Sequence, residues 1–209
     1  MTEDGRGRWL VWSASVVVVV MAVYDFVALG LIKTKIAMSI KVAIRVRPFN
    51  PRELKLKTEL CVKMVDNTTI LTSEDGKERK FAFDYSFWSH DGFREEENGL
   101  LVAEDSNYAD QQEVYDKVGK EILDNAWLGY HCCLFAYGQT GSGKSYSIVG
   151  YGNNTGVVPR AADEIFKRIE STRSPTQIFE VTVSMMEIYN EKVHDLMVPL
   201  SQQKEVCEL

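Results

Sequence analysis

Ten residues, Ala136 to Ser145, read AYGQTGSGKS and contain the spacing G-x-x-x-x-G-K-[ST]. Glycines at this spacing let the backbone wrap closely around a bound group where a Cβ atom would clash. The successive backbone N–H groups then point inward and favour an anion. Lys144 would add a positive charge for the outer phosphates of a nucleotide, and Ser145 a hydroxyl ligand for Mg²⁺. The residues of this predicted phosphate loop are Gly138, Gln139, Thr140, Gly141, Ser142, Gly143, Lys144 and Ser145.

The segments on either side of the loop favour this interpretation over a glycine-rich turn with an incidental lysine. Cys132 to Ala136 is a short apolar run, which predicts a buried parallel strand. Lys144 to Val149 can continue as a helix. A strand, a glycine-rich loop and a helix in this order are the context that a phosphate-binding loop needs.

Composition limits the classes of partner and cofactor. The chain has 209 residues, which suffice for one domain with a sizeable core. A net charge of −6 gives no electrostatic footprint for a nucleic acid, so no nucleic-acid partner is expected. The four cysteines and three histidines have no metal-ligand spacing. The metal ion that we expect is therefore Mg²⁺, bound together with nucleotide at Ser145.

The N-terminal part of the chain is unusual. Trp9 to Ile32 is almost wholly apolar, and its 24 residues contain Asp25 as the only charge. This length can span a bilayer. The alternative is an upstream extension outside the working domain, with Met38 as a natural start. We therefore predict an apolar extension over residues 1–37, in which membrane association is an open alternative, and a domain over residues 38–209.

The remaining pattern alternates strands with helices, which indicates an α/β fold. Predicted strands are Ile40–Val46 (half-buried), Leu60–Met64, Thr69–Thr72, Lys80–Phe87 and Phe179–Tyr189. Trp88 to Asn107 is predicted to be a polar surface loop. One helix is predicted to start at Asp110, with capping-box spacing to Glu113, and another runs from Pro159 to about Glu170.

Four stretches together resemble the kinesin motor domain. They are Ile44 to Phe49 (IRVRPF), Leu134 to Ser145 (LFAYGQTGSGKS), Gly156 to Arg160 (GVVPR) and Glu187 to Leu196 (EIYNEKVHDL). The similarity runs from about Ile40 to Met197. The stretch Phe87 to His90 (FWSH) looks like the third kinesin family, the long-range organelle transporters.

The resemblance implies a P-loop NTPase fold of kinesin motor type, with a mixed central sheet flanked by helices. It implies ATP and Mg²⁺ as ligands. Arg45, Arg47 and Pro48 match the adenine side of the family's pocket, and Tyr146 lies where the family places a ring beside the base. Considered without the resemblance, Arg45 and Arg47 would be interpreted as the solvated edge of a strand.

The resemblance also implies partners and a location. A complete motor would bind microtubules, carry organelle or vesicle cargo, and lie in the cytoplasm on the cytoskeleton. The family's two switch segments, which position water and Mg²⁺, do not occur after Asp195. We therefore expect a motor fragment with an incomplete fold.

Three rival hypotheses remain open at this point. The first is a truncated nucleotide-binding module without hydrolysis or motility. The second is a P-loop kinase or another NTPase, which the three other matched stretches disfavour. The third is a membrane-anchored protein, which depends only on Trp9 to Ile32.

Overall fold

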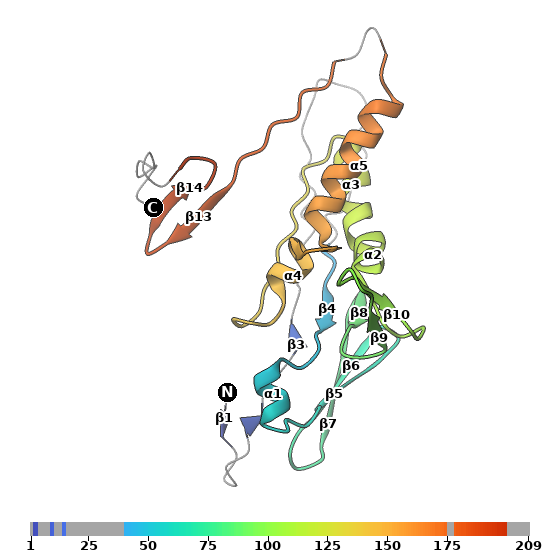
Figure 1. The fold of residues 1–209 in the computed structure, drawn as a ribbon, viewed down its shortest axis with the longest axis vertical. Coiled ribbons are helices and arrows are strands. Elements are labelled where there is room, and N and C mark those ends of the chain that lie inside the picture. Colours follow the sequence, from blue (N-terminus) through green and yellow to red (C-terminus); the bar gives the residue numbers. More distant parts are fainter. Residues whose placement is uncertain (1, 4–8, 11–13, 16–39, 175–177, 200–209) are drawn as a thin grey trace. The chain divides into compact units, whose positions relative to one another are not determined.

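The computed structural model describes residues 2–3, 9–10, 14–15, 40–174 and 178–199 (Figure 1). Residues 1–166 form one compact unit and residues 167–209 form a second. The candidate site lies wholly in the first unit, so its elements are described before those of the second.

A small mixed sheet lies at the centre of the first unit. Its strand order is β3 (Ala14–Ser15), β4 (Ala43–Val46) and β8 (Tyr85–Trp88). Strand β4 runs parallel to β8 and antiparallel to β3, so the predicted mixed sheet is present. The expectation that β4 is half-buried is wrong, because all four of its residues are buried.

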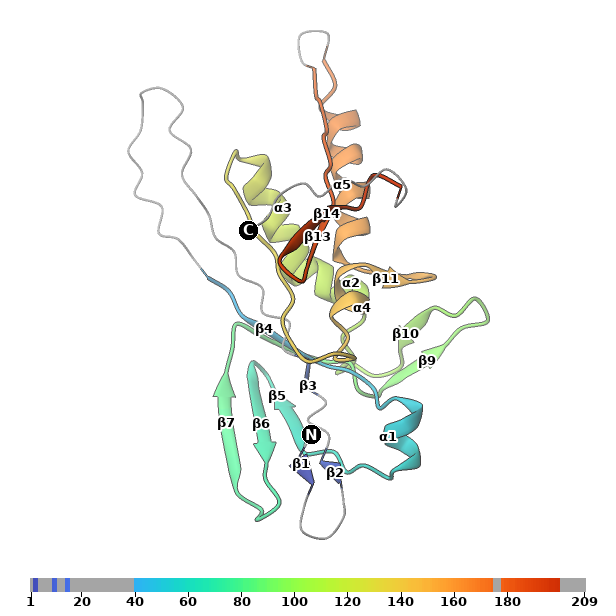
Figure 2. The same ribbon diagram turned by 90° about the vertical axis from the view of Figure 1, so that its left-hand side faces the viewer.

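A separate antiparallel sheet consists of β5 (Val62–Val65), β6 (Thr68–Thr72) and β7 (Glu78–Ala82). Figure 2 shows these strands set apart from the helices. The two short strands predicted between residues 60 and 72 are confirmed. The single strand predicted over residues 80–87 is divided at Phe83 and Asp84, because β7 pairs with β6 whereas β8 pairs with β4.

Two elements were not predicted from the sequence. Helix α1 (Pro51–Lys55) follows β4. Strands β9 (Phe93–Glu95) and β10 (Leu101–Ala103) form a hairpin inside the segment predicted to be a polar loop. Strands this short carry too few residues for alternation of apolar and polar side chains to be recognised.

The predicted first helix is one continuous helical segment with a π-helical turn in it. It comprises α2 (Gln111–Val114), η1 (Tyr115–Gly119) and α3 (Lys120–Trp127). As expected, the Asp110 side chain caps it by accepting a hydrogen bond of 2.7 Å from the backbone N–H of Glu113. Its apolar face packs on β4 and β8. The buried core consists of Ala43, Phe87, Ala109, Val114, Tyr115, Val118 and Val157.

The chain after the phosphate loop forms α4 (Lys144–Ile148), a hairpin of β11 (Gly150–Tyr151) and β12 (Asn154–Thr155), and α5 (Val157–Ser171). The helices predicted from Lys144 and from Pro159 are both confirmed. A Cβ atom on Gly119 would lie 2.8 Å from a methyl carbon of Val157. Glycine at this position therefore permits η1 and α5 to approach closely.

The second unit contains a hairpin of β13 (Met186–Tyr189) and β14 (Lys192–Asp195). Its turn uses left-handed backbone at Asn190 and Glu191. The strand predicted from Phe179 is wrong in its first half, because residues 178–185 belong to no strand and are largely exposed. Alternation of apolar side chains shows which face a strand would bury, but a strand forms only where a partner completes the ladder of hydrogen bonds.

The predicted apolar span from Trp9 to Ile32 lies mostly outside the described residues. The described parts of the N-terminal segment are strands: β1 (Thr2–Glu3), β2 (Trp9–Leu10) and β3. Within the described ranges, no helix is both long and apolar enough to cross a membrane.

Candidate functional site

The phosphate loop has the backbone conformation that its glycines allow. Gly138, Gly141 and Gly143 have φ angles of 150°, 77° and 97°. Apart from its two chain neighbours, no described residue has an atom within 4 Å of a Cβ atom placed on Gly141, so its left-handed backbone, and not lack of space, favours glycine there. The backbone N–H of Ser142 donates to the carbonyl of Gln139 at 3.1 Å, which closes the turn that leads into α4.

The loop has polar side chains both at its surface and in its interior. The Nζ atom of Lys144 donates to the carbonyl oxygens of Gly138 at 2.8 Å and Gln139 at 2.9 Å, so this charge lies over the loop. Ser145 is exposed at the start of α4. Ser142 is 2% exposed, and among the described residues its hydroxyl has no hydrogen-bond partner. A buried hydroxyl of this kind usually has a partner.

The strand predicted before the loop is not formed. Residues 132–136 lie outside any described strand, and they alternate between half-buried and exposed. Residues 132–136 are apolar, but a buried strand also needs neighbouring strands on both sides. The geometry of the phosphate loop is nevertheless present, because its own turn and the Lys144 contacts hold it.

A cavity of about 210 Å³ adjoins the phosphate loop, and we call it the base-side cavity. It brings together all four residues predicted for the adenine side: Arg45, Arg47, Pro48 and Tyr146. The other residues that line it are Ser89, Leu101, Tyr108, Ser142, Gly143 and Ser147. Leu101 and Tyr108 were not predicted from the sequence, because they come from a hairpin and a loop far along the chain from both motifs.

Arg45 is part of the protein interior and not a solvated strand edge. It is 3% exposed. Its guanidinium donates to Ser89 Oγ at 2.9 Å, Gln111 Oε1 at 2.7 Å and Ser147 Oγ at 3.1 Å. It also lies 5.2 Å from the centre of the Tyr146 ring, within the range of a cation–π interaction. Arg45 therefore ties the central sheet to α2 and α4.

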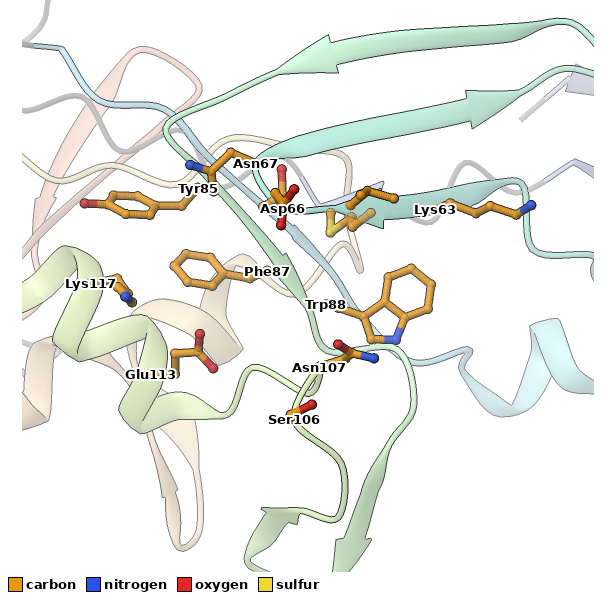
Figure 3. A pocket seen from close by; sticks show the side chains of 13 residues that line it. Lys63, Asp66, Asn67, Tyr85, Phe87, Trp88, Ser106, Asn107, Glu113 and Lys117 are labelled. Carbon is orange, nitrogen blue, oxygen red and sulfur yellow. The ribbon is translucent and has the colours of Figure 1, made fainter.

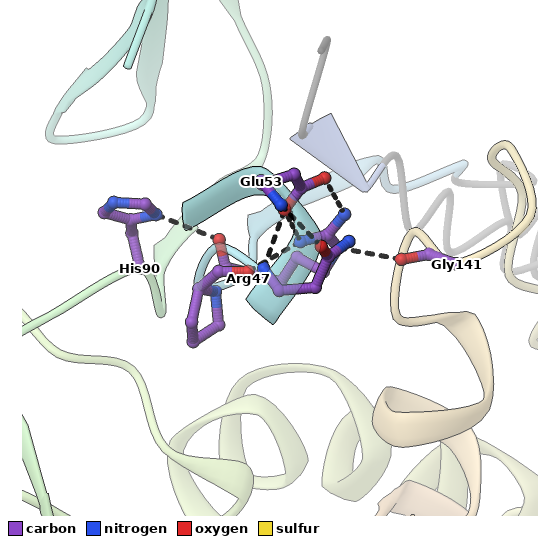
Figure 4. A network of polar contacts seen from close by, with 6 residues as sticks. Arg47, Glu53, His90 and Gly141 are labelled. Carbon is purple, nitrogen blue, oxygen red and sulfur yellow. Dashed lines mark hydrogen bonds and ion pairs between the residues drawn. The ribbon is translucent and has the colours of Figure 1, made fainter. Parts of the chain in front are cut away.

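Arg47 connects the strand end to the phosphate loop (Figure 4). Its Nε donates to the carbonyl of Gly141 at 2.7 Å. Its two terminal nitrogens each donate to one carboxylate oxygen of Glu53 at 2.7 Å. His90 Nδ1 lies 3.0 Å from the Arg47 carbonyl oxygen. Glu53 was missed from the sequence, although its spacing from Asn50 is that of the capping box that begins α1.

Burial shifts the pKa values of the groups around the base-side cavity. It raises the pKa of Tyr108 to about 12, and it also raises the pKa of Tyr146. Both phenols are therefore neutral at physiological pH. Burial lowers the pKa of Arg45, while the nearby phenol of Tyr146 opposes that shift. An arginine side chain is not deprotonated in proteins, so the guanidinium of Arg45 keeps its charge in neutral solution.

The Arg47–Glu53 pair predicts a pH dependence of stability. Hydrogen bonds from Arg47 lower the pKa of the Glu53 carboxyl below its ordinary value of 4.5, and burial opposes that shift. The pair therefore stabilises the fold fully above pH 4.5, and the stabilisation is lost as pH falls through the lowered value. At pH 7 we expect Glu53→Gln to lower the free energy of unfolding by about 1 to 2 kcal/mol, since bonds to charged groups are lost.

Thermal melts of the native chain and of Glu53→Gln, recorded from pH 7 down to pH 3, test this expectation. The difference in melting temperature should shrink as the pH falls. Asp75→Asn is the matched control, because Asp75 pairs with Lys77 through side chains that are 52% and 80% exposed. That substitution should leave the melting temperature nearly unchanged. A Glu53→Gln difference that is constant with pH would contradict the assigned role of the ion pair.

A second and larger cavity, of about 730 Å³, lies between α2, β8 and the turn that joins β5 to β6 (Figure 3). Aromatic side chains of β8 and charged side chains of both signs face it, among them Lys63, Asp66, Glu113 and Lys117. None of the residues predicted to bind nucleotide lines it. Size alone therefore does not identify the site, because the phosphate loop adjoins the smaller cavity.

Comparison with known proteins gives consistent matches. The family model of the kinesin motor domain matches residues 45–208. Kinesin-related protein 1 of Dictyostelium discoideum is 46% identical over 177 residues, which are 78% of this chain and 8% of that protein. Kinesin-like protein KIF13A of Homo sapiens is 46% identical over 168 residues, which are 77% of this chain and 9% of that protein.

A solved structure of KIF14 with ADP in complex with a microtubule is similar in fold, with a TM-score of 0.61 and 35% sequence identity. The match covers 78% of this chain and 42% of that one. The chain thus spans less than half of the solved motor structure, and less than a tenth of the two curated relatives just described.

Proposed function

Because the chain belongs to the kinesin motor-domain family, we propose that it binds ATP with Mg²⁺ and supplies the ATP-binding part of a microtubule motor. The observation that carries this proposal is the juxtaposition of two features in one unit. A glycine-rich loop with left-handed backbone lies next to a cavity lined by Tyr146 and Pro48. A loop of this kind suits phosphates, and the cavity suits a planar base.

The phosphate end of the proposed site is formed by the loop and the start of α4. Backbone N–H groups of residues 141–145 would bind the phosphates, and Lys144 would turn from the loop carbonyls toward the outer phosphates. The buried Ser142 hydroxyl, which has no partner among the described residues, supports a bound polar group here. Ser145 would be the protein ligand of Mg²⁺. The bound Mg·ATP supplies the γ-phosphate that water attacks and a metal charge that offsets the charge on the phosphates.

The base end of the proposed site is the base-side cavity. The Tyr146 ring would stack on the purine, since a base offers a π-face to an aromatic side chain. Arg45 lies 5.2 Å from the centre of that ring, and Pro48 and Arg47 also line the cavity. These assignments give a role to each of the cavity-lining residues that the sequence analysis matched to the adenine side of the pocket.

The proposal for the complete protein follows from its relatives. We propose microtubules as the track, organelle or vesicle cargo, and a location on the cytoplasmic cytoskeleton. The FWSH stretch supports membership of the third kinesin family. The solved KIF14 structure in complex with a microtubule supports the choice of track.

Calorimetric titration of the chain with ATP tests the nucleotide proposal. We expect saturable binding at one site, and weaker binding when EDTA removes Mg²⁺. A chain that melts cooperatively but shows no heat of binding with ATP would contradict the proposal. A parallel assay of ATP turnover with and without microtubules separates a hydrolysing motor from a module that only binds nucleotide.

A further inference from the structure

Gln111 is a buried amide that sequence interpretation did not single out. It is the first residue of α2 and is 4% exposed. Its Oε1 accepts from Arg45 Nη1 at 2.7 Å. Its Nε2 donates to the backbone carbonyls of Tyr146 at 2.7 Å and Asn154 at 3.0 Å. One side chain therefore joins β4, α4 and the β11–β12 hairpin.

The partners of Gln111 fix the orientation of its amide. Arg45 can only donate, so it requires the amide oxygen. The carbonyls of Tyr146 and Asn154 can only accept, so they require the two amide hydrogens. If the amide were flipped, its NH₂ group would face the donor of Arg45, and its oxygen would face the two backbone carbonyl oxygens. A glutamine amide has one acceptor oxygen and two N–H donors, which match the one donor and the two acceptors around it.

The contact with Tyr146 meets a need of α4 itself. That helix has five residues and ends at Ile148, so the carbonyls of its last turn lack helical partners. Val149 donates to the carbonyl of Ser145 at 2.8 Å. Gln111 serves the carbonyl of Tyr146 in the same way, from a different helix. Gln111 therefore satisfies a backbone carbonyl of α4 that lies at Tyr146.

The contact with Asn154 leads to a second residue that lines the base-side cavity, Leu101. The Asn154 side chain accepts from the backbone N–H of Leu101 at 2.9 Å and donates to the carbonyl of Gly99 at 2.7 Å. Leu101 and Tyr146 both line the cavity, whereas Gln111 does not. Gln111 thus contacts the backbone of Tyr146 directly and is linked to Leu101 through Asn154.

We propose that Gln111 is a positioning residue that sets the spacing of Leu101 and Tyr146 and thereby determines how well the site accepts the base of a nucleotide. This inference rests on the proposed ATP-binding function. The phosphate loop has its own supports, namely its turn and the contacts of Lys144 with the loop carbonyls. Loss of the Gln111 contacts therefore affects the base end of the site and leaves the phosphate end intact.

The test compares two ligands of the chain, ATP and inorganic tripolyphosphate, each with Mg²⁺. Gln111→Glu keeps an acceptor for Arg45 but loses both donated hydrogen bonds and turns an oxygen toward two carbonyls. We expect its affinity for ATP to fall about tenfold, the equivalent of one or two lost hydrogen bonds. Its affinity for tripolyphosphate, which has no base, should stay within about twofold of that of the native chain. A purely structural role would weaken both ligands equally.

Two further variants complete the test. Gln112→Glu makes the same chemical change at the exposed neighbouring residue, and both of its affinities should match those of the native chain. Asn154→Ala cuts the link to Leu101 without touching Arg45, and it should lower ATP affinity alone, by a smaller factor. If Gln111→Glu does not melt cooperatively, the ATP and tripolyphosphate affinities of Asn154→Ala test the proposal instead.

Equal losses for both ligands, or unchanged ATP affinity in Gln111→Glu and Asn154→Ala, would overturn the positioning role while the native chain still binds ATP. A native chain that binds neither ligand would instead overturn the proposed function, and this inference with it.

Discussion

Replacing Lys144 with methionine is expected to weaken ATP binding by the chain roughly a hundredfold, which corresponds to about 3 kcal/mol. Methionine keeps an unbranched side chain of similar reach but has no charge. The substitution removes the charge that the proposal assigns to the outer phosphates, and charge-assisted hydrogen bonds to phosphate are among the strong ones. It also removes the two contacts by which Lys144 lies over the loop carbonyls of Gly138 and Gln139.

Calorimetric titration of ATP into the Lys144→Met chain measures this effect. Lys77→Met is the matched control, because that lysine side chain is 80% exposed and does not line the base-side cavity. The control should bind ATP as the native chain does. If Lys144→Met bound ATP with native affinity, the phosphate loop would not be the site of nucleotide binding.

Replacing Arg45 with methionine is expected to lower the free energy of unfolding of the first unit by about 3 kcal/mol, because buried acceptors would lose their donor. Arg45 is 3% exposed and donates to two serine hydroxyls, the Gln111 amide and a backbone carbonyl. Methionine fills part of the space but can donate to none of these oxygens. The amide of Gln111 and the ring of Tyr146 would then lose the group that holds them.

Urea denaturation of Arg45→Met, followed by circular dichroism, measures the change in stability. Arg79→Met is the control, since Arg79 lies on β7, whose residues are all exposed. Its stability should differ from that of the native chain by less than about 0.5 kcal/mol. Equal stabilities for the two variants would mean that the Arg45 network does not support the fold, and that Arg45 serves the base-side cavity alone.

Much of the fold follows from local sequence. The prediction of an α/β P-loop NTPase fold of kinesin motor type is confirmed by the solved neighbours, over the part of the motor that this chain spans. The phosphate loop, the helix cap at Asp110 and the start of α5 near Pro159 appear where the sequence indicated them. Each depends on residues within one turn of a helix or loop, which is why a sequence pattern suffices to place them.

The strands that were predicted wrongly or missed share a different cause. The strand predicted at residues 132–136 and the first half of the one predicted from Phe179 did not form, because strand formation also depends on partners elsewhere along the chain. The hairpin of β9 and β10 was missed because its strands are too short to show a pattern. Local propensity decides whether a segment can be a strand, and pairing decides whether it is one.

For this protein, the sequence alone indicated the family, the glycine-rich loop and four residues that line the base-side cavity, because those features lie in contiguous motifs. Only the tertiary structure showed that Arg45 is buried, that Glu53 pairs with Arg47, and that Gln111 donates to the backbone carbonyls of Tyr146 and Asn154. These groups come from separate segments, and their hydrogen bonds are satisfied only when β4, α2 and α4 are packed together. A buried polar side chain takes its role from its partners, and those partners are set by the fold.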